Sequence, residues 1–397
     1  MINVVCFNGG RGAAAIIPSL LEVPNIKLTS IVNAYDDGKS TGAIRNYFDM
    51  LGPSDIRKVQ QLMLSKTDVD YLSSNWLFEY RFPKNATNNG TVKTLKKEIF
   101  FDQRFENTNL LHEIKSYLRT FLINLDLIKK TKNFKQFSFG DCSLMNCIYA
   151  GAFIDHGRNI EKAALSIEKL FNLKASVLPN TLENKKLMGI RENGIFLYSE
   201  AEIVELRSNI SVEKIFLLDD YLKKKYFEKL SKREKLSFLN SHQSYVELTE
   251  RSSRAISDAH IIIFSPGTQH SSLYPTYLSK GVASSIANNL DAQKIFISNI
   301  GADYETPKYF VDDYISGAFK YLTSSDFKRF NMNELFTHVL VNKPKSKDKK
   351  RYVQIRSKEL NSIPVPIIID DFESDIEPGK HCGQKLLNKI FGLYRQL

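Results

Sequence analysis

Residues 28–45 read Leu-Thr-Ser-Ile-Val-Asn-Ala-Tyr-Asp-Asp-Gly-Lys-Ser-Thr-Gly-Ala-Ile-Arg, and this stretch decides the fold. It begins with an apolar, partly β-branched run, Leu28 to Val32, that lacks helical spacing and predicts a buried strand ending near Asn33. Acidic residues and glycines follow the strand, and a short amphipathic helix comes next. In an open α/β sheet, ligands bind beyond the carboxyl ends of the strands, so we expect a phosphate or metal site here.

Three acidic residues form the candidate catalytic group, namely Asp36, Asp37 and Asp55. Clustered carboxylates can hold Mg²⁺ and so align and neutralise a phosphoryl group. We expect Asp37 and Asp55 to be the metal ligands, with Asp36 as a base or as a partner of those ligands. The structural alternative is a solvated, helix-capping turn at Asp-Asp-Gly, a common role for these residue types.

The composition is that of an ordinary soluble globular protein, with a formal net charge of +11. The basic residues are dispersed and are not interleaved with aromatic residues, so nucleic acid is a disfavoured partner. We interpret the charge mainly as a solvated surface, and a basic cleft for phosphorylated ligands is the alternative. Cys6, Cys142, Cys147 and Cys382 show neither disulfide nor zinc spacing. We find no leader peptide and no bilayer-spanning run, and we therefore expect a reduced, cytoplasmic protein.

A glycine-rich loop follows the first predicted strand. The strand, Ile2 to Phe7, runs into Asn8-Gly9-Gly10-Arg11-Gly12, and a helix is expected from Ala13 to Leu21. Glycines let the backbone approach a phosphate closely, and the free amides of a helix N-terminus attract it. The spacing is not that of a dinucleotide fold, and Asn33 stands where a Walker A loop would need its leading glycine, so a dehydrogenase and a P-loop protein are disfavoured.

A second candidate phosphate loop follows the buried strand Ala259 to Phe264. The loop reads Ser265-Pro266-Gly267-Thr268-Gln269-His270-Ser271-Ser272, and a helix comes after it. Both loops would open at the same edge of a parallel sheet, where their amides can converge on one anion. We therefore place a diphosphate near Gly10, Gly12, Gly267 and Thr268.

Strands and helices alternate along the chain, which predicts an α/β fold with a doubly wound, mainly parallel, Rossmann-like sheet. Helical spacing dominates after residue 56, and we expect a helical insertion at about 65–135. Residues 1–342 are predicted to form the nucleotide-binding domain. Residues 343–397 are predicted to begin with a basic linker, 343–351, and to add a C-terminal strand and helix to the same domain.

Taken together and in order, these motifs resemble those of the CofD/YvcK-like family. This family contains 2-phospho-L-lactate transferases of deazaflavin cofactor biosynthesis and sugar-nucleotide-binding factors linked to gluconeogenesis and cell shape. The resemblance covers most of the chain, and its segments are Asn8 to Gly12, Val32 to Gly42, Gly52 to Arg57, Leu77 to Phe82, Ser143 to Asn146, Ser265 to Ser272, and Asn299 with Glu305 and Thr306.

The resemblance implies a CofD-like, Mg²⁺-dependent transferase that moves a phospho-acyl or phosphoryl-type group from a nucleoside diphosphate derivative to an unknown acceptor hydroxyl. The alternative is a non-catalytic, nucleotide-sugar-binding regulatory protein of the YvcK type, and a homodimer is allowed for in either case. The nucleotide-binding residues would be Gly9, Gly10, Arg11, Gly12, Asn146, Pro266, Gly267, Thr268, Ser271, Ser272 and Asn299.

Overall fold

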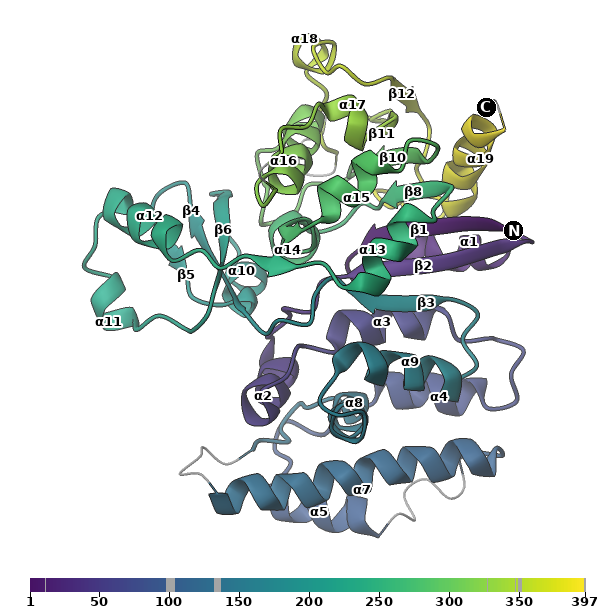
Figure 1. Ribbon diagram of the computed structural model, residues 1–397, viewed down its shortest axis with the longest axis vertical. Coiled ribbons are helices and arrows are strands. Elements are labelled where there is room, and N and C mark those ends of the chain that lie inside the picture. The colour runs from purple at the N-terminus through teal and green to yellow at the C-terminus, as the bar shows by residue number, and fades with distance from the viewer. Residues whose placement is uncertain are drawn as a thin grey trace. The chain divides into compact units, whose positions relative to one another are not determined.

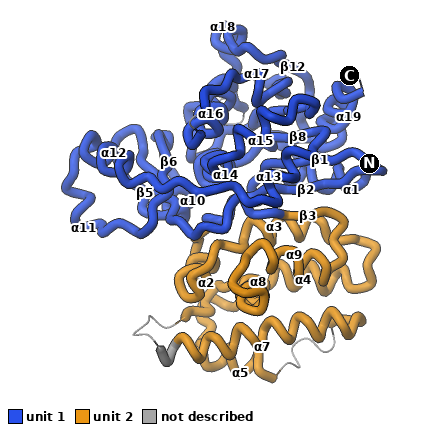
Figure 2. The backbone as a smooth tube through the Cα atoms, viewed as in Figure 1, with its two compact units in different colours: residues 1–35, 178–397 blue, residues 36–177 orange. Residues whose placement is uncertain are grey.

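The chain folds into two compact units in a computed structural model that describes residues 1–10, 12–97, 104–131, 137–326, 328–346, 348 and 352–395. Unit 1 comprises Met1–Tyr35 and Leu178–Leu397, and unit 2 comprises Asp36–Val177 (Figure 2). The predicted helical insertion lies within unit 2. The predicted boundary after residue 342 falls inside unit 1.

A seven-stranded parallel sheet forms the centre of the fold (Figure 1), which confirms the predicted fold class. The strands, in chain order, are β1 (Ile2–Asn8), β2 (Ile26–Val32), β3 (Ser176–Pro179), β8 (Ile261–Phe264), β10 (Gln293–Ile297), β11 (His338–Asn342) and β12 (Ile367–Asp370). Across the sheet they are ordered β12-β11-β10-β8-β1-β2-β3. The strand β3 spans the point where the chain passes from unit 2 back to unit 1.

The strand order reverses beside β1. From β1 the chain adds β2 and β3 towards one edge, whereas β8, β10, β11 and β12 extend the sheet towards the other edge. The strand β1 is therefore paired in parallel on both sides, with Val4 opposite Leu28 of β2 and Ile261 of β8. A reversal of this kind leaves a crevice beyond the carboxyl ends of the two central strands, which is where open α/β sheets bind ligands.

The central strand β8 is apolar along its whole length because both faces of the sheet are covered. All four residues of β8, Ile261–Phe264, are buried, and the ring of Phe264 stacks on that of Phe7 with a centroid separation of 5.2 Å. Uninterrupted apolar runs are typical of strands in the middle of a covered parallel sheet. The periodicity of the sequence predicts this strand correctly.

The helix expected from Ala13 to Leu21 is broken into two pieces. A 3₁₀-helix, η1 (Gly12–Ala15), is followed by α1 (Ile17–Leu21), with Pro18 in the first turn of α1. Proline lacks a backbone N–H, so it suits the start of a helix but interrupts one that is already running. The continuous helix of the sequence prediction is therefore wrong.

Among the other helices of unit 1, α13 packs with α15, and α1 packs with α19. Their bounds are α10 (Glu200–Glu205), α11 (Lys224–Phe227), α12 (Lys232–Ser241), α13 (Glu250–Ser257), α14 (Tyr274–Tyr277), α15 (Val282–Asn288), α16 (Val311–Thr323), α17 (Met332–Leu335), α18 (Ser357–Leu360) and α19 (Gly383–Tyr394). One further element, η2 (Gln269–Leu273), is a π-helix that directly precedes α14.

Two small sheets complete unit 1. The first is antiparallel with the order β5-β4-β6, made of β4 (Lys186–Arg191), β5 (Phe196–Leu197) and β6 (Val212–Leu218). Its β4–β5 turn contains the pair Asn193-Gly194, which favours a tight hairpin, and Gly194 has a φ of +83° and donates its N–H to Arg191 O. The second sheet pairs β7 (Val246–Glu247) with β9 (Ser279–Lys280).

Unit 2 is built from helices, as the spacing after residue 56 predicts. These are α2 (Lys39–Phe48), α3 (Ser54–Leu62), α4 (Tyr71–Glu79), α5 (Asn88–Lys96), α7 (Thr108–Thr131), α8 (Leu144–Asp155) and α9 (Ile160–Leu170). Ten of the twelve residues of α8 are buried, from Leu144 to Phe153, so this helix forms the core of the unit. Across the described residues, no helix has the length and apolarity needed to cross a membrane.

The helices α7 and α8 pack so closely that one position admits only glycine. A Cβ added to Gly151 would lie 1.9 Å from the carbonyl oxygen of Tyr117. We expect Gly151→Ala to lower the free energy of unfolding by about 1–3 kcal/mol, because the two helices must move apart. Urea denaturation followed by circular dichroism measures this loss.

The matched control is Gly392→Ala in α19, where an added Cβ meets no atom within 4 Å. Alanine is the better helix former, so this variant should be as stable as the wild type or up to about 1 kcal/mol more stable. Equal stability of the Gly151 variant and the wild type would contradict the tight packing of α7 against α8.

Candidate functional site

The predicted site residues fall into two groups, one in each unit. Unit 1 holds the glycine loop after β1, the loop after β8, and Asn299 after β10. Unit 2 holds Asp36, Asp37, Asp55 and Asn146. The predicted nucleotide contact Arg11 lies outside the described residues.

Within unit 1, the two predicted phosphate loops come into direct backbone contact. They leave the adjacent central strands β1 and β8 at the point where the strand order reverses. A Cβ added to Gly12 would lie 2.1 Å from the carbonyl oxygen of Pro266, and one added to Gly9 would lie 2.7 Å from Cβ of Ser272. The glycines are therefore required by the close approach of the two loops. The sequence prediction that both loops meet at one edge of the sheet agrees with this geometry.

Asn299 fixes the shape of the second loop. Its side-chain oxygen accepts the N–H of Gly267 at 3.0 Å, and its side-chain nitrogen donates to the carbonyl oxygen of Gly267 at 2.9 Å. The residue follows β10, the neighbour of β8 in the sheet. Three consecutive strands of the sheet, β1, β8 and β10, thus contribute their carboxyl ends to one group of loops.

A short chain of hydroxyl groups continues from this loop. Ser271 Oγ donates to Thr268 Oγ1 at 3.0 Å, and Thr268 Oγ1 donates to Ser272 Oγ at 3.0 Å. Thr268 and Ser272 are partly exposed, whereas Ser271 is buried. Two of the three predicted hydroxyl residues are therefore accessible to a ligand of unit 1.

Glu305 holds the π-helix that carries these hydroxyls. Its Oε2 accepts the N–H groups of His270 at 2.7 Å and of Ser271 at 3.1 Å, and its Oε1 accepts the hydroxyl of Ser271. Burial, with the nearby Asp303 as the second cause, raises the pKa of Glu305 to about 8. The sequence analysis names Glu305 only within the Glu-Thr pair of the family resemblance. No local spacing shows which backbone amides the Glu305 side chain binds.

The ring of His270 lies in a buried aromatic environment. It makes edge-on contacts with Tyr274 and Tyr321, at centroid distances of 4.9 and 6.1 Å. Burial, together with Lys320 and Arg191, lowers the pKa of His270 to about 3. The imidazole is thus neutral at physiological pH, and its main-chain N–H rather than its ring binds Glu305.

Within unit 2, two of the three predicted carboxylates share one cation. Lys58 Nζ lies 3.1 Å from Asp55 Oδ1 and 3.4 Å from Asp36 Oδ2. Burial opposes the charged form of Lys58, but the two carboxylates outweigh it and raise the pKa of the ammonium group. The sequence analysis does not single out Lys58, although its spacing of three residues from Asp55 on a predicted helix is a usable signal.

The other Asp36 oxygen stabilises the turn before α2. Asp36 Oδ1 accepts the N–H of Gly38 at 3.1 Å, and Gly38 is the N-cap residue of α2, without a side-chain cap. The turn proposed as the structural alternative is therefore present, together with the ion pair. Asp37 is buried, with 8% of its surface exposed.

As they stand, these residues do not fit a resident magnesium ion. Among the described residues, no group of three or more His, Cys, Asp or Glu side chains is arranged to hold a metal. The position between Asp36 and Asp55 is taken by the ammonium group of Lys58. The predicted metal role of Asp37 and Asp55 stays a prediction.

Asn146 connects helices inside unit 2. Its side-chain nitrogen donates to Ser40 Oγ at 3.1 Å, and Ser40 Oγ also accepts the N–H of Ser143 at 2.8 Å. Asn146 is fully buried. These bonds tie the start of α8 to the first turn of α2, which gives Asn146 a structural role.

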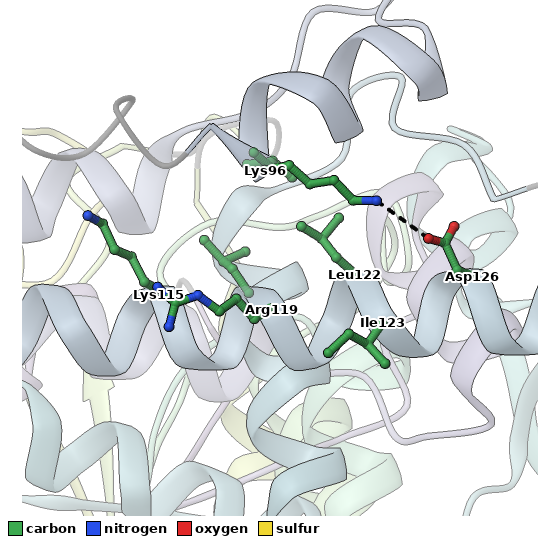
Figure 3. Close-up of a pocket in the computed structure, with 8 residues that line it drawn as sticks. Lys96, Lys115, Arg119, Leu122, Ile123 and Asp126 are labelled. Carbon is green, nitrogen blue, oxygen red and sulfur yellow. Dashed lines mark ion pairs between the residues drawn. The ribbon is translucent and has the colours of Figure 1, made fainter.

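A pocket of about 250 Å³ lies elsewhere in unit 2, between α5 and α7 (Figure 3). Leucine and isoleucine side chains line it, and Lys96 and Asp126 form an ion pair of 3.6 Å at its edge. None of the predicted site residues lines this pocket, so it plays no part in the candidate site.

The raised pKa of Glu305 predicts a pH-dependent stability. A carboxyl group whose pKa is about 8 in the folded chain, against an ordinary value of 4.5, stabilises the fold when protonated and loses that contribution as the pH rises through 8. His270 has the opposite effect, but only below its ordinary pKa of 6.5. Between pH 6.5 and 8 we therefore expect stability to fall with a slope of at most about 1.4 kcal/mol per pH unit.

Glu305→Gln should remove most of this slope, because glutamine resembles the protonated acid. Thermal unfolding at several pH values compares it with the wild type and with Glu250→Gln, which changes an exposed Glu250–Arg254 ion pair. The control should keep the wild-type slope. An unchanged slope in the Glu305 variant would show that this carboxyl does not titrate in the window.

Relatives of the chain carry a common name. A protein from Listeria innocua named gluconeogenesis factor is 23% identical over 98% of this chain and 95% of its own length. One of the same name from Halalkalibacterium halodurans is 24% identical over 79% of this chain and 71% of its own length. A longer relative from Clostridium acetobutylicum, named putative gluconeogenesis factor, is 24% identical over 93% of this chain, which spans 64% of that protein.

Solved structures show the same fold. A UPF0052 family protein from Bacillus halodurans matches with a TM-score of 0.67 at 20% identity, covering 98% of this chain and 100% of that chain. The family model described as 2-phospho-L-lactate transferase CofD matches residues 4–373. That range includes both loops of unit 1, Asn299, and the carboxylates of unit 2. The chain therefore belongs to the CofD family, as its motifs predict.

Proposed function

We propose that the chain binds a nucleoside diphosphate derivative on unit 1 and acts as a nucleotide-sugar-binding regulatory protein. The observation that carries this proposal is the meeting of two glycine-containing loops at the reversal of the strand order, between β1 and β8. Close backbone contact, partly exposed hydroxyls and the ends of parallel strands are what a diphosphate site requires.

The residues proposed to surround the diphosphate have distinct roles. Gly10 and Gly12 add no side chain at their own positions in the first loop, while Thr268 and Ser272 offer hydroxyl groups from the second. Asn299 holds Gly267 by both its N–H and its carbonyl oxygen, so the loop is fixed before a ligand arrives. A loop that is already ordered loses less conformational entropy on binding.

The relatives from Listeria innocua and Halalkalibacterium halodurans are named gluconeogenesis factors, a name that does not describe a transferase. We propose in addition that the protein is cytoplasmic and that its ligand is a small-molecule nucleotide rather than a nucleic acid. A homodimer is compatible with this proposal, and size-exclusion chromatography with light scattering tests it.

A second candidate function is group transfer, which the description of the matching family favours. An acceptor hydroxyl would attack the outer phosphorus of the nucleoside diphosphate derivative. A new P–O bond would form, the bond to the bridging oxygen would break, and a nucleoside monophosphate would leave. Asp36 is the proposed base for the acceptor proton, and the observation in its favour is the Asp36–Lys58–Asp55 cluster of unit 2. Magnesium dependence belongs to this candidate alone.

Calorimetry with GDP, UDP and UDP-sugars, with and without Mg²⁺, tests the first proposal, and Asn299→Ala makes the test specific. Removing the two hydrogen bonds to Gly267 should weaken nucleotide binding by about 1–2 kcal/mol, a factor of roughly 5 to 30. Tight binding of an intact nucleotide sugar without Mg²⁺ and without turnover is the expected wild-type result.

The chain provides a matched control in Asn289→Ala. Asn289 is also partly buried and donates to the carbonyl oxygens of Ile256 and Ala259, both at 2.8 Å, away from the two loops. Its loss should reduce stability about as much as the loss of Asn299, but leave nucleotide affinity unchanged. Equal affinities in both variants would argue against the proposed diphosphate site.

Asp55→Asn tests the transfer candidate. If the Asp36–Lys58–Asp55 cluster supports chemistry, release of nucleoside monophosphate should fall by about 10²-fold or more, because the charge balance around Asp36 changes. Asp126→Asn, in the exposed Lys96–Asp126 pair, should leave the rate unchanged. Near-normal turnover in the Asp55 variant, with turnover present in the wild type, would remove Asp55 from the mechanism.

A further inference from the structure

The ammonium group of Lys58 occupies the position that a metal ion would need in unit 2. It contacts an oxygen of Asp55 at 3.1 Å and an oxygen of Asp36 at 3.4 Å. The Lys58 side chain is 29% exposed, whereas those of Asp36 and Asp55 are 15% and 6% exposed. The two carboxylates are thus the less exposed part of the cluster, and the lysine is its most exposed member.

A backbone N–H holds the Asp36 carboxylate, and Asp55 lies at a helix N-terminus. Asp36 Oδ1 accepts the N–H of Gly38, and the Asp36 carbonyl accepts a hydrogen bond from Arg45 at 3.3 Å. Asp55 lies in the first turn of α3, where the helix N-terminus favours a negative charge. Lys58 is one turn further along the same helix, so α3 presents an acid together with its own counter-ion.

A magnesium ion and the Lys58 ammonium cannot share these two carboxylates. Magnesium binds oxygen at about 2.0–2.1 Å, so an ion bridging the two carboxylates would lie close to the ammonium group that now contacts both of them. With both present, a divalent and a monovalent cation would lie within a few ångströms of each other, at a large Coulomb cost.

Two further positive groups add to this cost. Arg57 is buried, and its guanidinium donates to the carbonyl oxygen of Phe78. Arg45 is fully buried and donates to the main chain of Asp36. These two buried arginines add positive charge near the Asp36–Asp55 pair, which further disfavours a divalent ion there.

We infer that Lys58 is the resident cation of the Asp36–Asp55 pair and excludes divalent metals from it. The pair is closed to Mg²⁺ while Lys58 is in place, and removing the lysine charge opens a divalent-cation site. This inference concerns the residues of the transfer candidate, but it does not depend on nucleotide binding. It is tested without any nucleotide, so its failure is distinct from failure of the proposed function.

The test is titration of Mn²⁺ alone into the full chain, with the free ion followed by electron paramagnetic resonance. We expect no saturable site at the pair in the wild type. Lys58→Met keeps the length of the side chain without its charge and should tighten Mn²⁺ binding by about tenfold or more. The double variant Lys58→Met with Asp55→Asn should lose the site again.

Lys96→Met is the matched control, since it breaks another Lys–Asp ion pair of unit 2 (Figure 3), in which both side chains are 55% exposed. It should leave Mn²⁺ binding at the wild-type level. Should Lys58→Met fail to fold, as judged by circular dichroism, the wild type and Asp55→Asn alone decide the question, and they should bind Mn²⁺ equally. A wild-type Mn²⁺ site that Asp55→Asn removes would overturn the inference.

Discussion

The parallel pairing of β1 on both of its sides is the constraint on which unit 1 depends. The register places Val4 opposite both Leu28 and Ile261, so the first strand of the chain forms the middle of the sheet. Strands added in opposite directions from this centre leave their connecting loops at one edge. The glycine loop and the loop after β8 meet there, and β10 adds Asn299 beside them.

The loops at this edge are held by polar contacts to side chains that are buried or partly buried. Glu305 accepts two backbone N–H groups of the π-helix, and Asn299 bonds both sides of Gly267. Buried polar groups are costly unless they are paired, so each pair fixes one loop conformation. The π-helix carries His270, Ser271 and Ser272, and π-helices are local irregularities that are often found at functional sites.

The carboxylates of unit 2 match a metal-site motif in the sequence, but their observed partner is a lysine. Asp36 and Asp55 come together, as a metal site would require, but the cation between them is Lys58. An internal lysine bridges the pair without any ion from solution. This arrangement suits a binding protein directly, whereas a metal-dependent transferase would first have to displace Lys58.

The sequence by itself determined the strands, the helical block after residue 56, the Asn-Gly hairpin and the family, because each depends on short-range periodicity, turn chemistry or motif order. Only the tertiary structure decided that a new helix, α1, starts at Ile17 and that Gly151 faces Tyr117. It also decided that Glu305 binds the amides of the π-helix and that Lys58 lies between two acids. The physical reason is distance along the chain. Glu305 is more than thirty residues from the amides that it binds, and Asp36 is more than twenty from Lys58, so no local pattern encodes these contacts.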